Sequence, residues 1–123
     1  MIKLVYVVRR RSDVSPEEFR RYWLEEHGPL VKSIAPEHGS RRYVQSHTID
    51  TPLNDALVSI RGMSPWYDGI TEIWADSLEA IQATLASEDG QRAFGRLGED
   101  EAKFIDIANS TIFLTEEHTI FDL

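Results

Sequence analysis

The stretch Ile2–Arg9 is predicted to be a β-strand with two apolar faces, and this property limits the folds open to the chain. Its residues are mostly β-branched or aromatic, which is typical of strands. Because side chains alternate, one face carries Ile2, Leu4, Tyr6 and Val8, and the other carries Val5 and Val7. A sheet with one solvated face would alternate apolar and polar residues. This strand therefore needs cover on both sides.

Three further strands and two helical regions follow, in the order β-α-β-β-α-β. The strands are predicted over 40–49, 67–76 and 107–115, and the helices begin at Pro16 and after Ser77. This order predicts the α+β class and a ferredoxin-like βαββαβ sandwich, a four-stranded antiparallel sheet with both helices on one face. The other face is then bare, and a monomer would expose a large apolar patch. We therefore expect a homodimer in which two copies pack sheet face to sheet face.

The first helix places a histidine beside apolar side chains. In its opening S-P-E-E sequence, Ser15 can cap the helix and Pro16 fits the first turn. One side of the helix carries residues at four-residue intervals, namely Phe19, Trp23 and His27. Gly28 and Pro29 predict that the helix ends just after His27. A lone histidine in such a place is commonly a hydrogen-bonded core residue, and this interpretation stands beside a functional one.

Length and composition describe one globular domain over residues 1–123. No apolar run approaches the roughly 20 residues that cross a bilayer. The net charge of −8 argues against nucleic-acid binding, which depends on Lys and Arg neutralising phosphates. No export signal is visible, so we expect no membrane partner and a cytoplasmic location. The chain has no Cys, and its four His lack H-x-H or H-E-x-x-H spacing, so we expect no metal site.

Two predicted strands carry polar residues that could line a pocket. One face of the strand over 40–49 carries Tyr43, Gln45 and His47. This face could be the pocket wall or the dimer face. One face of the strand over 67–76 carries Ile70, Glu72 and Trp74. A carboxylate such as Glu72 between apolar neighbours lies at an edge, is paired with a cation, or is kept protonated by burial.

Residues 50–66 form an insertion that is too long for a hairpin loop of about two to five residues. Thr51 and Pro52 can start a short helix within it, and Gly62 would end that helix. With Trp66 at its close, the insertion could be a lid over a site or a loop without such a role.

Two motifs resemble those of the EthD family, named for ethyl tert-butyl ether degradation, within the dimeric α/β barrel superfamily. The first is S-P-E-E-F-R-R-Y-W-L-E-E-H-G-P-L, from Ser15, and the second is Y-D-G-I-T-E-I-W-A-D-S-L-E-A-I, from Tyr67. The resemblance spans nearly the whole chain, including the acidic stretch Asp100–Ile105, and covers the insertion least. It implies a single EthD-like domain, a dimeric α/β barrel with a ligand cavity between helices and sheet, without metal or flavin.

The resemblance also implies a site at His27, which matches the histidine of the family's W-x-x-x-H-G-P motif. Relatives include dehydratases, decarboxylases and lactone isomerases, and also proteins of unknown role. We therefore expect a cofactor-independent lyase or isomerase acting on a small oxygenated aromatic or polyketide-like molecule, with His27 as general acid or base. The other candidate site residues are Tyr43 and Glu72 as catalytic groups, and Trp23, His47, Trp66 and Trp74 as substrate-binding groups. The alternative is a non-catalytic small-ligand-binding accessory protein that uses the same cavity.

Overall fold

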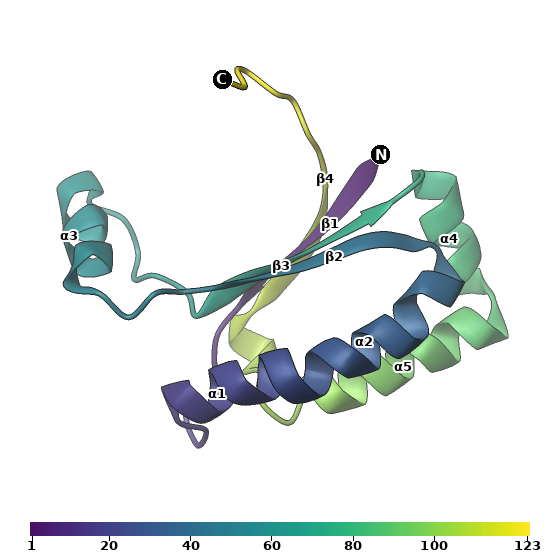
Figure 1. The fold of residues 1–123 in the computed structure, drawn as a ribbon, viewed down its shortest axis with the longest axis horizontal. Helices are drawn as coiled ribbons and strands as arrows, with labels where there is room; N and C mark the ends of the chain where they lie inside the picture. The colour runs from purple at the N-terminus through teal and green to yellow at the C-terminus, as the bar shows by residue number, and fades with distance from the viewer.

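The computed structural model describes residues 1–123 as a four-stranded antiparallel sheet with a layer of helices on one face (Figure 1). The strands are β1 (Ile2–Val8), β2 (Ser40–His47), β3 (Gly69–Ala75) and β4 (Thr111–Glu116), in the spatial order β2-β3-β1-β4. This is the ferredoxin-like βαββαβ arrangement, and the predicted α+β class is confirmed. No helix combines the length and the apolar character that crossing a bilayer requires.

A continuous helical segment follows β1, although we predicted that the first helix ends at Gly28. The segment consists of α1 (Pro16–Tyr22), the π-helical turn η1 (Trp23–His27), α2 (Gly28–Ile34) and the 3-10 turn η2 (Ala35–His38). Gly28 is helical, and the chain leaves the segment at Gly39, whose φ is 88°. In a regular α-helix Pro29 would clash with the carbonyl of Glu25. The wider turn just before Pro29 relieves that conflict, so His27 lies in mid-segment.

The second helical region consists of α4 (Leu78–Ala86) and α5 (Glu88–Glu101). The break between them lies at Ser87, whose Oγ accepts a hydrogen bond from the N–H of Gly90 and so caps α5. α5 runs through Gly90, Gly95 and Gly98 without a further break. The cap and the packing of α5 against η1 and α2 outweigh the low helix propensity of glycine. A short 3-10 turn, η3 (Ile107–Asn109), then leads into β4.

The insertion between β2 and β3 forms α3 (Pro52–Arg61), as predicted. Thr51 caps this helix, because its Oγ1 accepts a hydrogen bond from the N–H of Leu53. Figure 1 shows α3 beyond the end of the sheet and away from the other helices, and α3 buries none of its side chains. It is therefore not a lid over the space between the helices and the sheet.

Strand pairing divides the sheet into a helix-covered face and a helix-free face. Tyr6 pairs with Thr71 on the helix-covered face, whereas Val5 pairs with Glu72 on the helix-free face. The core lies on the helix-covered side and contains Val8, Phe19, Trp23, Phe104 and Ile105. The helix-free face is about half apolar and carries Val5, Val7, Val44, Ile70, Trp74 and Phe113 beside polar residues such as Lys3 and Glu72. Both faces of β1 are thus apolar, as its sequence indicates.

Candidate active site

His27 lies between two carboxyl groups under the helical layer, and only 3% of its surface is exposed. Its Nδ1 is 2.8 Å from Oδ2 of Asp100, and its Nε2 is 3.7 Å from Oε2 of Glu101. The Tyr22 hydroxyl donates a hydrogen bond of 2.6 Å to Oδ1 of Asp100. An ionised Asp100 can only accept, so Nδ1 of a neutral His27 carries the proton and Nε2 presents its lone pair toward Glu101. No group of three or more His, Asp or Glu side chains is placed to hold a metal ion.

The two carboxyl groups beside His27 have pKa values that are shifted in opposite directions. Burial disfavours the charge on Asp100, but hydrogen bonds from Tyr22 and His27 outweigh burial and lower the pKa of Asp100. Burial, together with the charge of Asp100, raises the pKa of Glu101 to about 7. Burial also lowers the pKa of His27, and the hydrogen bond to Asp100 offsets only part of this change. Near neutral pH the site therefore combines a carboxylate, a neutral imidazole and a partly protonated carboxyl group.

Among the cavities between the helices and the sheet are three of which the two larger ones each share lining residues with the smallest. The smallest, which we call the inner hollow, has a volume of about 10 Å³ and is lined by Tyr6, Trp23, His27, Val31, Tyr43, Thr71, Ile73, Glu101 and Ile105. The α2–β2 pocket, of about 440 Å³, shares Val31 and Tyr43 with the inner hollow. The β4 pocket, of about 180 Å³, shares Tyr6, Glu101 and Ile105 with it. These shared side chains are the walls between His27 and the two larger cavities.

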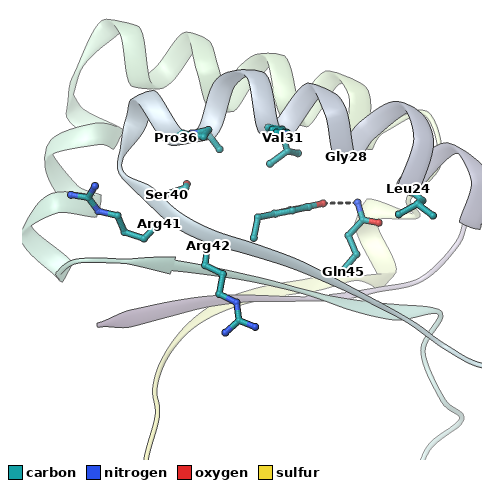
Figure 2. Close-up of a pocket in the computed structure, with 11 residues that line it drawn as sticks. Leu24, Gly28, Val31, Pro36, Ser40, Arg41, Arg42 and Gln45 are labelled. Atoms are coloured by element: carbon teal, nitrogen blue, oxygen red, sulfur yellow. Dashed lines mark hydrogen bonds between the residues drawn. The ribbon is translucent and has the colours of Figure 1, made fainter.

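Gln45 holds the wall between the α2–β2 pocket and the inner hollow. Its side-chain amide donates to the Trp23 carbonyl at 2.8 Å and to the Tyr43 hydroxyl at 2.9 Å, the second of which is drawn in Figure 2. Its amide oxygen is 2.8 Å from Nε2 of His47, whose ring stacks on Trp23 with 4.3 Å between the ring centroids. Of the two placements left open for Tyr43 and His47, the structure therefore shows the helix-covered face and not the helix-free face.

Glu72 and Trp74 lie on the helix-free face, so our expectation that they line the cavity is wrong. Both residues alternate with Thr71 and Ile73, and it is this second pair that faces the helices and lines the inner hollow. The Glu72 carboxylate is 2.7 Å from Nζ of Lys3, which is the cation pairing that we considered for it. Glu72 therefore does not contact a ligand in these cavities.

The three remaining substrate-binding candidates have different surroundings. Trp23 lines the inner hollow, and its ring lies so close to β3 that a Cβ on Gly69 would be 2.5 Å from it. His47 stacks behind Trp23 and lines neither the inner hollow nor the α2–β2 pocket. Trp66 is 41% exposed and donates a hydrogen bond to Asp55 of α3. It lines none of these three cavities but a separate one of about 100 Å³ beside Phe19, and therefore shares no cavity with His27.

Four residues that meet at this site are not predicted as site residues from the sequence, namely Tyr6, Tyr22, Asp100 and Glu101. A signal for two of them is present in the sequence. Residues 99–101 are three consecutive acidic residues in the last turn of α5, which has no basic residue there. The helix dipole disfavours negative charge at this end of a helix. An acidic run in such a place indicates carboxyl groups held by partners outside the helix.

The EthD domain model matches residues 11–108, which is most of the chain. The chain belongs to the EthD domain family. This result confirms the resemblance seen in the motifs around His27 and in β3. A comparison with curated proteins gives no match.

Solved structures share the fold of this EthD domain at low sequence identity. An ethyl tert-butyl ether degradation family protein from Bacillus halodurans C-125 has a TM-score of 0.63 and 23% identity, covering 96% of this chain and 99% of that one. A hypothetical protein from Arabidopsis thaliana has a TM-score of 0.59 and 16% identity, covering 98% and 90%. A dimeric protein of unknown function from Bacteroides fragilis NCTC 9343, with a ferredoxin-like fold, has a TM-score of 0.55 and 14% identity, covering 94% and 95%. These similarities establish the fold and no reaction.

Proposed function

We propose that this EthD domain is a cofactor-independent lyase or isomerase that acts on a small oxygenated aromatic or polyketide-like molecule. The reactions that fit are dehydration, decarboxylation or a double-bond shift beside a carbonyl group. The observation that carries the proposal is the buried His27 between an ionised Asp100 and a partly protonated Glu101. Carboxyl groups whose surroundings separate their pKa values are typical of acid–base sites.

In a dehydration, Nε2 of His27 takes the proton from the carbon beside the carbonyl, and the electrons of that C–H bond form an enolate. The Glu101 carboxyl gives its proton to the departing hydroxyl group, so that water leaves and a carbon–carbon double bond forms. The imidazolium and the carboxylate then face each other across 3.7 Å. Transfer of the proton from Nε2 to Glu101 restores the starting state. Asp100 stabilises the imidazolium through its hydrogen bond to Nδ1.

Tyr43, which lines the inner hollow together with His27, donates a hydrogen bond to the enolate oxygen in this proposal. Burial raises the pKa of Tyr43, so its hydroxyl keeps its proton at neutral pH. The inner hollow has a volume of about 10 Å³, whereas small-molecule sites usually have several hundred. Substrate binding therefore requires that the side chains between His27 and a larger cavity, Tyr43 among them, move apart.

The proposal predicts exchange of substrate protons with solvent. The protein is incubated in D₂O with a panel of aryl β-hydroxy ketones and β-keto acids, and ¹H NMR follows the hydrogens beside the carbonyl. For a panel member that binds, we expect protein-dependent loss of this signal and release of water or carbon dioxide. Binding without exchange or turnover for every panel member that binds would contradict the proposal.

A non-catalytic ligand-binding role is the second candidate function. The observation that favours it is the position of the largest cavity, since the α2–β2 pocket lies beside His27 and is not lined by it. This role predicts saturable binding with no chemical change in the ligand. Single-turnover experiments with an excess of protein over ligand distinguish the two functions.

We also propose that the chain forms a two-fold homodimer through the helix-free face. This face carries apolar side chains that no helix covers, and Ile70 and Phe113 are 40% and 47% exposed on it. The similar protein from Bacteroides fragilis is described as dimeric. Light scattering should give twice the 14.1 kDa mass of one chain, and the substitution Phe113→Glu should shift the protein toward monomer. A wild-type particle of 14.1 kDa would contradict the proposal.

A further inference from the structure

The α2–β2 pocket carries positive charge in a protein that is acidic overall. The chain has 21 acidic and 13 basic residues, yet the lining of this pocket contains Lys32, Arg41 and Arg42 and no Asp or Glu. Its volume of about 440 Å³ is within the usual range of small-molecule sites. The helical segment supplies apolar walls from Leu24, Val31, Ala35 and Pro36. This combination suits an apolar molecule that bears a negative charge.

Lys32 is the cation of this pocket that has no partner. Arg41 pairs with Asp76 at 2.7 Å. The Arg42 guanidinium lies over the Trp74 ring, 4.6 Å from its centroid, and Figure 2 shows the Arg42 side chain pointing to the opposite side of the sheet. Lys32 takes part in none of the ion pairs of the protein. A negative charge on a ligand would therefore meet the ammonium group of Lys32.

We propose that the α2–β2 pocket binds an aromatic carboxylate, with the carboxylate at Lys32 and the ring between α2 and Tyr43. A single unpaired ammonium group matches one negative charge, whereas a phosphate dianion usually engages several donors. Because Val31 and Tyr43 also line the inner hollow, the ring would end at the wall that faces His27. The claim that this ligand is the substrate rests on the proposed function, but the claim that the pocket binds it does not.

The test compares two probes of the same shape, 2-naphthoate and the neutral 2-naphthamide, by titration in ¹H–¹⁵N NMR spectra. The backbone amides of Gly28 and Ser40 report on the pocket, which both residues line. We expect 2-naphthoate to bind about five- to tenfold more tightly than 2-naphthamide at low salt, and this preference to shrink as salt is added. The preference should disappear in Lys32→Gln. It should remain in Arg61→Gln, which makes the same change of charge on the distant α3.

Any of four results would overturn the proposal. The first two are equal affinity of the two probes for the wild type and an unchanged preference in Lys32→Gln. The other two are chemical-shift changes confined to residues outside the pocket and no binding of either probe. Lys32 is exposed, so its variant should keep the well-dispersed spectrum of the folded protein. If 2-naphthoate binds at Lys32 but no substrate exchanges protons with solvent, the proposed carboxylate site is supported and the proposed enzymatic function is refuted. If a substrate exchanges protons but the protein does not prefer 2-naphthoate, the enzymatic function is supported and the carboxylate site is refuted.

Discussion

The substitution His27→Gln is expected to lower kcat by about 10²- to 10⁴-fold, the usual contribution of one general acid or base. Glutamine can still hydrogen-bond to Asp100, but it has no basic nitrogen that could take a proton from the substrate. The rate of proton exchange in D₂O and the steady-state turnover both measure the effect. His118→Gln is the matched control, because His118 is exposed near the C-terminus, and it should keep the wild-type rate.

A kcat that His27→Gln leaves unchanged would remove His27 from the mechanism. The imidazole also packs against Phe104, with 5.2 Å between the ring centroids, so the substitution also costs some stability. Urea unfolding of the variant separates the two effects. A variant that is folded under the assay conditions and inactive has lost the proton transfer and not the fold.

The free energy of unfolding should fall as the pH rises through the titration of Glu101. In the folded protein the pKa of Glu101 is about 7, compared with 4.5 for an ordinary glutamic acid. Between these pH values the folded state holds a proton that the unfolded chain releases, so the stability that this proton provides is lost as the pH increases. The difference between the two pKa values corresponds to about 3 kcal/mol.

Glu101→Gln removes this dependence, because an amide is neutral at every pH. Relative to this variant, the wild type should lose about 3 kcal/mol in the free energy of unfolding between about pH 4.5 and pH 7.5, measured with urea. His27 acts in the opposite sense, because its lowered pKa makes the fold more stable as the pH rises toward 6.5. The difference between the free energies of unfolding of the wild type and of Glu101→Gln does not contain the contribution of His27, because both proteins have it.

The exposed neighbour Glu99 provides the control for this measurement. Glu99→Gln removes the same charge two residues before Glu101 in α5, and its stability should follow the wild-type pH dependence. If the wild type and Glu101→Gln gave parallel curves, Glu101 would titrate as an ordinary surface carboxyl group. The proposed transfer of a proton from Nε2 of His27 to the Glu101 carboxylate would then be unsupported.

Alternation along the strands predicts the fold, but it does not tell which face of the sheet the helices cover. On β3, one face carries Ile70, Glu72 and Trp74, and the other carries Thr71 and Ile73. Both sets can pack, because both faces of the sheet carry apolar residues. The common face of Glu72 and Trp74 is therefore predictable, whereas its position away from the helices is not. Polarity distinguishes two faces only when one of them meets water.

The candidate site is predictable only in part for a similar reason. The motif around His27 and the family resemblance point to the imidazole. Asp100 lies 73 residues later and meets His27 only because α5 packs beside η1. Its partner Glu101 belongs to an acidic run that looks like solvated surface until the packing of α5 is known.

Five buried side chains of the long helical segment are each four residues from the next, namely Phe19, Trp23, His27, Val31 and Ala35. Four residues of a regular α-helix rotate about 40° past a full circle, so this row would spiral roughly 160° around the axis along its length. The π-helical turn has more residues per turn than an α-helix, so it rotates the row of side chains back in the opposite direction. The direction of the imidazole therefore depends on the pitch of that one turn.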